Sequence, residues 1–303
     1  MRILVVGAKG QLGRELCACF ERGYTELGVP DVLKEKNTVR GVDIDEVDIS
    51  KLDAVRAVMN DGYDAVINCA AYTNLNGCET DRDIAFLANA IGPRNLAMAC
   101  EETGARLVHV STDYVFRGDG TVPYTEYDLT EPVSVYGKTK LLGEEYVREF
   151  CTKYFIVRTA WLYSYYGNNF VKTMMKINRE RGASRVVSDQ IGNPTNAADL
   201  AHHILKLVTT EHYGVYHATG TGECSWYEFT KKILEYAGIA AEVSPCTTDE
   251  YPTPAKRPAF SSLDNVMLRV SVGDEFRPWQ DALACFMKNY LEMENNNFKG
   301  EKR

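Results

Sequence analysis

Residues 2–13 read Arg-Ile-Leu-Val-Val-Gly-Ala-Lys-Gly-Gln-Leu-Gly, an apolar run that leads directly into three regularly spaced glycines. The run is short, β-branched and apolar on both sides, as expected of a buried parallel strand. Leu12, Leu16 and Phe20 then recur at helical spacing. This order of strand, glycine loop and helix is typical of a dinucleotide-binding unit, in which the helix N-terminus faces a pyrophosphate. The expected cofactor contacts in the loop are Gly7, Gly10, Gln11, Leu12 and Gly13.

The same alternation continues along the chain. Apolar strands are predicted at 38–43, 64–71, 106–110, 154–158, 185–187 and 214–218, with helices between them. We therefore expect an α/β fold: a Rossmann-type doubly wound parallel sheet with a smaller, interleaved C-terminal substrate domain. Residues 1–160 should form the NAD(P)-binding domain, with its sheet completed by the strands near 185–187 and 214–218. Residues 161–303 should form mainly the substrate-binding domain. Within 83–103 the periodicity predicts one amphipathic helix with Leu87, Ile91 and Leu96 facing inward.

Composition narrows the function classes. The 303 residues carry a net charge of -8, which argues against a general nucleic-acid binder. No apolar run approaches the length of a membrane span, and the N-terminus lacks the apolar stretch of a signal peptide, so a cytoplasmic protein is expected. The nine cysteines are an odd number, scattered along the chain without a Cys-x-x-Cys pair. They predict free thiols rather than disulfides or a metal site.

The segment after the second predicted strand bears on the choice of cofactor. Asp43 ends that strand, where an acid can bind the adenosine ribose hydroxyls, although it lies further from the glycine loop than the usual spacing of about 20 residues. Asp48 and Ile49 are expected near the adenine, but Asp48 could equally cap a helix over 51–59. All charged residues between Arg40 and Lys51 are acidic. They disfavour a 2′-phosphate, so NADH is expected in preference to NADPH.

Two basic residues bear on the expected preference for NADH over NADPH. Lys9, in the glycine loop, could reach a 2′-phosphate, whereas Arg40 should lie well short of the ribose. The third predicted strand ends in small residues, which let a cofactor lie against the backbone. Ala70, Ala71 and Tyr72 are therefore expected to form a wall of the cofactor site.

Tyr136 and Lys140 are expected to share one face of a helix, because they are four residues apart and good helix formers follow them. A phenol ordinarily titrates near pKa 10. A lysine ammonium one turn away favours the phenolate, so Lys140 is expected to lower the pKa of Tyr136 toward working pH. Ser111 and Thr112 end the fourth predicted strand, where a hydroxyl could bond a substrate carbonyl. The alternative is a chance tyrosine–lysine pair on a solvated helix face.

Several motifs together resemble one family. They are Gly7-Ala-Lys-Gly-Gln-Leu-Gly13, Ala70-Ala-Tyr-Thr73, Ser111-Thr-Asp-Tyr-Val-Phe116, Asp189-Gln-Ile-Gly-Asn-Pro-Thr195, and Tyr251-Pro-Thr-Pro-Ala255 with Arg257-Pro258. With Tyr136-x-x-x-Lys140, they are similar to the extended short-chain dehydrogenase/reductase superfamily and, more closely, to the dTDP-4-dehydrorhamnose reductases. The resemblance implies an NAD(P)H-dependent reduction of a dTDP-linked 4-keto-6-deoxyhexose, dTDP-4-dehydro-6-deoxy-L-mannose, at its C4 ketone to give dTDP-L-rhamnose.

The resemblance also implies residue roles. Thr112 would bond the carbonyl oxygen, Tyr136 would protonate the developing alkoxide, and Lys140 would hold the nicotinamide ribose. One departure lies at Asn76-Gly77, where the family commonly has an acid followed by a base. The expected substrate contacts are Thr73, Thr112, Asp113, Tyr114, Trp161, Asn169, Trp226 and Arg257.

Those substrate contacts have alternatives of their own. Trp161 and Trp226 are as often core as pocket, whereas an arginine between prolines, such as Arg257, suits a diphosphate because its planar fork bonds two oxygens. The protein could also be another nucleotide-sugar reductase or epimerase, or a non-catalytic relative resembling the regulatory subunit of methionine adenosyltransferase. A monomer or homodimer is expected. No metal is expected, although Glu15 coincides with a magnesium-binding position in some members.

Overall fold

The computed structural model describes the backbone of residues 1–300 and the side chains of residues 1–295. Its centre is a sheet of six parallel strands in the order β10-β5-β4-β3-β1-β2. The strands are β1 (Arg2–Val6), β2 (Thr38–Val42), β3 (Ala65–Asn68), β4 (Arg106–Thr112), β5 (Tyr154–Thr159) and β10 (Gly214–His217). The chain leaves β1 to form β2 on one side and β3 on the other. That reversal creates a crevice at the carboxyl ends of the strands, which is the usual ligand site of such sheets.

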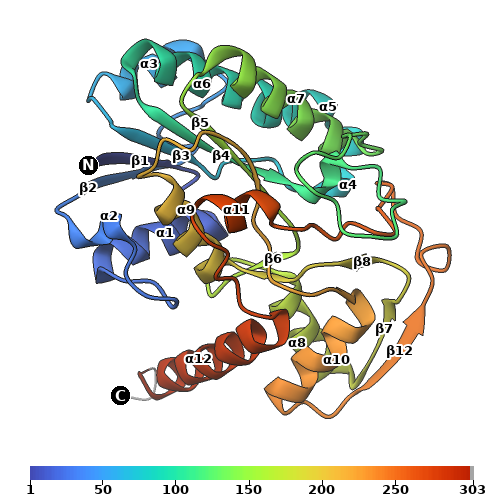
Figure 1. Ribbon diagram of the computed structural model, residues 1–303. Coiled ribbons are helices and arrows are strands. Elements are labelled where there is room, and N and C mark those ends of the chain that lie inside the picture. The colour runs from blue at the N-terminus through green and yellow to red at the C-terminus, as the bar shows by residue number, and fades with distance from the viewer. Residues whose placement is uncertain (301–303) are drawn as a thin grey trace.

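Helices cover both faces of the sheet (Figure 1). The helices α3 (Leu52–Met59), α6 (Gly92–Thr103) and α7 (Val135–Phe150) lie on one face, and α1 (Gln11–Arg22) and α9 (Ala197–Leu207) lie on the other. Alternate side chains of β1 point to opposite faces, as strand geometry requires. Ile3 and Val5 therefore join the core under α1 and α9, and Leu4 and Val6 join the core under α3 and α6. The predicted doubly wound α/β fold is confirmed.

A smaller lobe is built from later segments of the chain and lies beside the sheet (Figure 1). Its helices are α8 (Phe170–Arg181), α10 (Trp226–Ala237) and α12 (Trp279–Gly300). Its short strands pair as β6 (Leu162–Tyr163) with β9 (Thr195–Asn196), β8 (Ile191–Gly192) with β11 (Cys224–Ser225), and β7 (Ala183–Val187) with β12 (Glu242–Cys246). Its core is rich in aromatic side chains, among them Tyr163, Phe229 and Phe286.

One expected strand lies elsewhere. The segment near 185–187 forms β7 and pairs in parallel with β12 of the small lobe, so the prediction that it completes the main sheet is wrong. The physical reason is that β10, the other strand expected to complete the sheet, already occupies the free edge of β5. The domain boundary near residue 160 stays a prediction.

The segment expected to be one helix is interrupted by a π turn. It consists of α5 (Arg82–Phe86), the π turn η1 (Leu87–Ile91) and α6. The wider π turn shifts the phase of the helix. Leu87 is consequently exposed rather than buried, which contradicts the prediction, whereas Leu96 is buried as expected and Ile91 is half-buried. Asn89 turns inward instead, where its amide bonds the backbone of Tyr72 through Oδ1 at 2.8 Å and Nδ2 at 3.1 Å.

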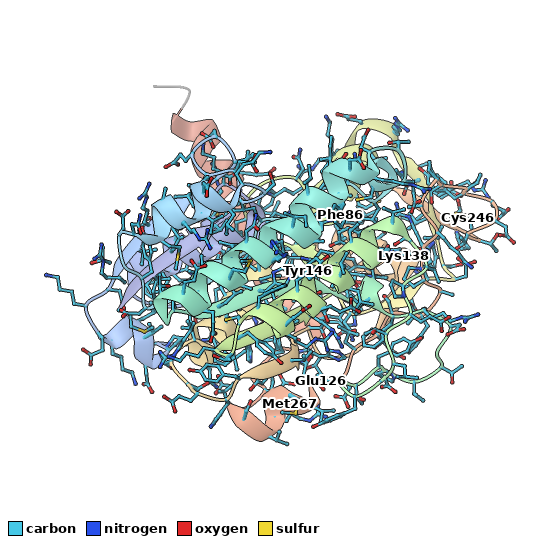
Figure 2. All side chains as sticks on the ribbon, turned by 90° about the horizontal axis from the view of Figure 1, so that it is seen from above. Phe86, Glu126, Lys138, Tyr146, Cys246 and Met267 are labelled. Atoms are coloured by element: carbon cyan, nitrogen blue, oxygen red, sulfur yellow. The ribbon has the colours of Figure 1, made fainter. Side chains whose placement is uncertain are left out.

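Residues 117–134 lead into α7 and are fixed at the edge of the molecule. Seen from above, Glu126 of this loop lies beside Met267 of α11 (Val266–Ser271), while Lys138 and Tyr146 mark α7 (Figure 2). The Met267 amide donates to the Glu126 carboxylate at 3.0 Å. The remaining short elements are α2 (Asp31–Lys34), α4 (Leu75–Thr80) and the 3₁₀ turn η2 (Asp113–Val115).

Two further sequence expectations concern cysteines and membranes. All nine cysteines are free thiols, as predicted. Among the residues that the structure describes, no helix is long and apolar enough to cross a membrane.

Candidate active site

A continuous groove runs along the carboxyl ends of β1, β3 and β4. Its first part is a cavity of about 630 Å³ between the ends of β1, β2 and β3. Its second part, about 430 Å³, extends past the end of β4 and the start of α7 into the small lobe. The two parts share Gly10, Cys69 and Ala71 as lining residues. The crevice predicted from the strand order is therefore present.

The glycine loop forms the middle of this groove. Gly7 has a φ of 76°, and a Cβ on it would lie 2.7 Å from the Ala70 backbone nitrogen. A Cβ on Gly13 would collide with the Gly7 carbonyl oxygen. Helix α1 then begins behind Gly10 without a side-chain cap and without an acid in its first turn, so its N–H groups remain available. This cradle fits a dinucleotide pyrophosphate, because a helix N-terminus offers unpaired donors to an anion. Gln11 and Leu12 line the neighbouring cavity.

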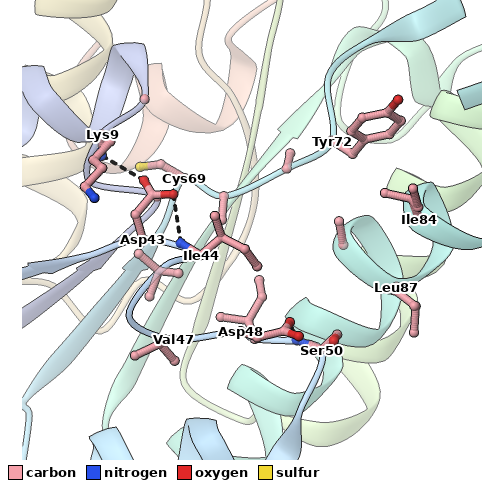
Figure 3. Close-up of a pocket in the computed structure, with 17 residues that line it drawn as sticks. Lys9, Asp43, Ile44, Val47, Asp48, Ser50, Cys69, Tyr72, Ile84 and Leu87 are labelled. Carbon is pink, nitrogen blue, oxygen red and sulfur yellow. Dashed lines mark hydrogen bonds between the residues drawn. The ribbon is translucent and has the colours of Figure 1, made fainter. Parts of the chain in front are cut away.

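Asp43 stands at the end of β2, inside the first cavity (Figure 3). Its carboxylate accepts the N–H of Lys9 at 2.9 Å and the N–H of Ile44 at 2.8 Å. The Lys9 ammonium pairs with Asp45 at 2.5 Å, and this hydrogen bond raises the pKa of Lys9. Arg40 instead pairs with Asp61 at 2.6 Å and does not line the cavity, in line with the expectation that it lies short of the ribose.

Away from Asp43, the first cavity is lined mainly by apolar side chains. Asp48 lines the cavity and accepts the Ser50 N–H at 3.0 Å. Lys51 holds the N-cap position of α3 without a side-chain bond, so Asp48 does not cap that helix. The remaining wall consists of Val47, Ile49, Ala70, Ala71, Tyr72, Ile84, Leu87 and Ala88 (Figure 3). An apolar slot of this kind suits an adenine ring.

Tyr136 and Lys140 lie in the first turns of α7, which Ser134 caps by accepting the Gly137 N–H at 3.1 Å. Burial raises the pKa of Tyr136 above its ordinary value, and the neighbouring Thr112 hydroxyl partly offsets this. The Lys140 ammonium donates to the Val110 carbonyl at 2.7 Å, and burial lowers its pKa to about 8. The prediction that Lys140 lowers the pKa of Tyr136 is therefore wrong for this structure, because burial outweighs the effects of its neighbours.

The two neighbouring hydroxyls at the end of β4 are directed differently, as strand alternation requires. Ser111 donates to the Glu144 carboxylate at 2.5 Å. Thr112 donates to the Asp113 carboxylate at 2.9 Å and lines the same cavity as Tyr136. Burial raises the pKa of Asp113 to about 6. The geometry thus separates Thr112, beside Tyr136, from Ser111, which is committed to the core.

Stacked tryptophans form the wall toward the small lobe. The rings of Trp161 and Trp226 lie 3.4 Å apart at an interplanar angle of 5°. Among the described residues Trp161 is the only non-glycine with a positive φ, at 46°. Such a conformation costs about 1–3 kcal/mol and is typical of functional sites. Gly192 leaves room for it, because a Cβ there would lie 2.6 Å from the Trp161 ring.

A third cavity of about 300 Å³ continues the groove beyond Trp226 and Arg257, which line both it and the second cavity. The Arg257 guanidinium donates to the Tyr114 hydroxyl at 3.5 Å. Tyr114 in turn lies edge-on to Tyr136, with ring centroids 5.6 Å apart. Arg257 therefore lies at the junction of the two cavities, next to Tyr114, which packs edge-on against Tyr136.

Most of the expected substrate contacts come together in the second cavity. Those that line it are Thr73, Thr112, Asp113, Tyr114, Trp161, Trp226 and Arg257. Asn169 does not line it. Asn169 is the N-cap of α8, where its amide donates to the Ser164 carbonyl at 2.8 Å and accepts the Lys172 N–H at 3.2 Å. An asparagine before a helical run is the usual signal for such a cap.

Other lining residues were not singled out from the sequence. They include Leu75 in the second cavity and Phe170, Met174, Arg185, Val186, Val187, Gln190, Tyr251 and Thr253 in the third. Gln190, Tyr251 and Thr253 lie within motifs that carried the family resemblance, which is the signal that could have found them. Asn76 of the departing Asn76-Gly77 pair accepts the Ala255 N–H at 3.3 Å. It thereby ties α4 to the loop that carries Arg257.

Glu15, which the resemblance places at a magnesium-binding position of some family members, forms a salt bridge. Glu15 is fully buried, and its carboxylate accepts the Arg22 guanidinium at 2.7 Å. Within the described part of the chain, no three His, Cys, Asp or Glu side chains are grouped so that they could hold a metal ion.

Comparison with known proteins identifies relatives over nearly the whole chain. Residues 1–292 match the family model described as the RmlD substrate binding domain. The spore coat polysaccharide biosynthesis protein SpsK of Bacillus subtilis is 39% identical, over 95% of this chain and 97% of its own length. The crystal structure of a dTDP-4-dehydrorhamnose reductase from Clostridium acetobutylicum superimposes with a TM-score of 0.90 at 44% identity, covering 97% of this chain and 100% of that one.

A second solved structure contains a cofactor. The dTDP-4-dehydrorhamnose reductase of Bacillus anthracis, in complex with NADP, has a TM-score of 0.88 at 42% identity and covers 95% of this chain and 99% of that one. The family model and these full-length similarities agree with the groove, its glycine cradle and the buried tyrosine–lysine pair. The chain therefore belongs to the RmlD family of NAD(P)-dependent nucleotide-sugar reductases.

Proposed function

We propose that this protein reduces the C4 ketone of dTDP-4-dehydro-6-deoxy-L-mannose to dTDP-L-rhamnose. The observation that carries the proposal is the position of Thr112, Tyr136 and Lys140. All three are buried and line one cavity, together with Gly10 and Gly13 of the glycine cradle and with Trp226 and Arg257. NAD(P)H, when bound, supplies a hydride to the ketone carbon.

Thr112 and Tyr136 both act on the ketone oxygen of the substrate. Thr112 donates a hydrogen bond to that oxygen, and Tyr136 delivers a proton as negative charge develops there. Burial keeps the Tyr136 phenol protonated in the resting protein, which is the form that an acid needs. Lys140 holds the nicotinamide ribose from the same helix face, one turn further on. Positioning and charge stabilisation together supply most of the acceleration.

The small lobe binds the nucleotide half of the substrate. Arg257 clamps the diphosphate, because a guanidinium fork bonds two oxygens at once. Trp161 and Trp226 form the adjoining wall, and the third cavity beyond them takes the base. In this division residues 1–160 mainly bind the cofactor and residues 161–303 mainly bind the sugar nucleotide.

For the cofactor, NADH is proposed in preference to NADPH. Asp43 is fixed by two backbone N–H groups at the place where a ribose would lie. The nearest cation, Lys9, is paired with Asp45, so a 2′-phosphate would have to compete for it. Because the Bacillus anthracis relative was crystallised with NADP, NADH and NADPH have to be compared directly. kcat/KM for the two cofactors at saturating sugar nucleotide decides the question, and an NADPH value equal to or above that for NADH contradicts the preference.

The reaction itself is tested by incubating the protein with NADH and dTDP-4-dehydrorhamnose. Loss of reduced-cofactor absorbance together with dTDP-L-rhamnose, identified by NMR, is the expected result. SpsK, a relative named for spore coat polysaccharide synthesis, motivates the same assay with other dTDP-4-keto sugars. Turnover of one of those alone would show a different nucleotide-sugar reductase. Absence of turnover with every sugar would favour a non-catalytic relative.

A further inference from the structure

A buried ion pair lies directly behind the proposed catalytic residues. Glu144 of α7 is fully buried, and Arg158 of β5 is 2% exposed. The Arg158 guanidinium donates to one carboxylate oxygen of Glu144 at 3.0 Å through Nε and to the other at 2.7 Å through Nη2. Ser111 adds a hydrogen bond to the same carboxylate at 2.5 Å. Both oxygens of Glu144 are thus fixed, as a buried carboxylate requires.

Glu144 follows Lys140 by one turn of α7, so the two side chains share a helix face. Lys140 is 1% exposed, and its ammonium donates to the Val110 carbonyl rather than to Glu144. Burial lowers the pKa of Lys140, and the charge of Glu144 is the strongest influence that raises it. Cys69 acts in the same direction only as a thiolate, and burial raises the pKa of that thiol, so it is neutral.

The other titratable groups around this cluster do not replace Glu144. Burial keeps two histidines neutral: it lowers the pKa of His109 on β4 well below its usual range and that of His217 on β10 to about 3. Arg148 approaches Glu144 only to 3.9 Å from the helix surface. Asp113 acts on Tyr136, and Glu79 accepts the Val135 N–H. Both carboxylates therefore act on the first turn of α7. Glu144 is therefore the anion best placed to act on Lys140.

We propose that Glu144 is a positioning residue for the reaction, whose fixed negative charge keeps the buried Lys140 protonated and directed at the Val110 carbonyl. This inference rests on the proposed function. Ser111 and Arg158 hold the carboxylate where it acts, and neither touches the substrate. A buried ammonium without such a partner loses its proton readily, because a low dielectric disfavours the charged form.

The test measures the protonation of Lys140 directly. NMR of protein labelled at the lysine Cε carbons follows each lysine through its titration, and Lys140→Met identifies the signal. Glu144→Gln removes the charge while keeping the shape. We expect the Lys140 midpoint to fall by about one to three pH units, the usual effect of a close opposite charge. Glu145→Gln is the matched control, because it makes the same change at the next, exposed position and should leave the midpoint in place.

Two more variants keep the test decisive if the unpaired Arg158 impairs folding. Glu144→Gln/Arg158→Leu replaces the ion pair by neutral groups, a change that buried pairs often tolerate. It should still lower the Lys140 midpoint, because the charge of Glu144, which raises the pKa of Lys140, is lost in this variant as well. Glu144→Asp keeps the charge and should restore the midpoint toward that of the parent. In each active variant, the loss of kcat/KM at high pH should move by the same amount as the midpoint.

A Lys140 titration unchanged in both Glu144→Gln and the double variant would overturn the inference, whatever happened to stability. The lysine titration needs no substrate, so it judges Glu144 even if the parent protein reduces none of the sugars offered. Failure of the proposed function would appear separately, as absence of turnover by the parent.

Discussion

The two hydroxyls at the end of β4 allow a sharp test of the active-site geometry. Thr112→Val removes the hydroxyl that donates to Asp113 beside Tyr136, while preserving the branched shape. Ser111→Ala removes the hydroxyl that donates to the buried Glu144. The two positions are adjacent in sequence, yet the first change should act on turnover and the second on stability.

The magnitudes follow from what each hydroxyl contacts. If Thr112 bonds the developing oxyanion, its loss should lower kcat by about 100- to 1,000-fold, the usual effect of removing one such donor. Ser111→Ala removes one hydrogen bond to a charged group, worth about 1.5–3 kcal/mol of unfolding free energy. At roughly 2–4 °C per kcal/mol for a chain of 150–250 residues, the melting temperature should fall by several degrees. Its kcat should stay within about ten-fold of the parent, because Arg158 still holds Glu144.

The assay is steady-state turnover of dTDP-4-dehydrorhamnose at saturating cofactor, measured well below the melting temperature of either variant. Thermal unfolding of each protein, followed by circular dichroism, supplies the stability comparison. Equal losses of kcat in Thr112→Val and Ser111→Ala would instead mean that the end of β4 does not separate the two side chains in the working enzyme.

Three further changes test other parts of the site. Tyr136→Phe should leave the cofactor dissociation constant nearly unchanged but lower kcat by about 10²–10⁴-fold, the usual contribution of a general acid, and turnover within a few-fold of the parent would remove Tyr136 from that role. Gly13→Ala should weaken NADH binding, measured by cofactor fluorescence, more than Gly10→Ala does. The new Cβ at Gly13 would collide with the Gly7 carbonyl oxygen, whereas the new Cβ at Gly10 would lie 3.2 Å from it. Burial raises the pKa of Asp113 to about 6 in the folded protein, above its ordinary value of 3.8, so the contribution of this group to folded-state stability is complete below pH 3.8 and gone above about pH 6. The unfolding free energy of Asp113→Asn relative to the parent should therefore increase by about 3 kcal/mol between pH 3.5 and pH 7 in urea titrations, and a pH-independent difference would contradict the buried charge.

The parts of the fold that the sequence predicts are those set by local patterns. The βα unit of the glycine loop and the helix that carries Tyr136 and Lys140 both depend on residues close in sequence. Both elements are present where they were expected. Strand alternation at Ser111 and Thr112 likewise predicts that the two hydroxyls point apart.

The parts that could not be predicted depend on tertiary competition. The π turn at 87–91 reverses the orientation expected for Leu87, and nothing in the local periodicity marks it. The pairing of β7 with β12 depends on β10 having taken the edge of β5, which is a contact between distant segments. The pKa of Tyr136 is set by burial, which one turn of helix does not reveal.

Following the transferred hydride shows whether the protein reduces the C4 ketone directly. The protein is incubated with dTDP-4-dehydrorhamnose and NADH carrying deuterium at the transferable C4 position of the nicotinamide, with both C4 epimers of the labelled cofactor tested in turn. We expect one epimer to yield dTDP-L-rhamnose with a single deuterium bonded to C4 of the sugar, detected by NMR and mass spectrometry. Product without deuterium from either epimer, or deuterium at another sugar carbon, would contradict direct reduction of the C4 ketone in this groove.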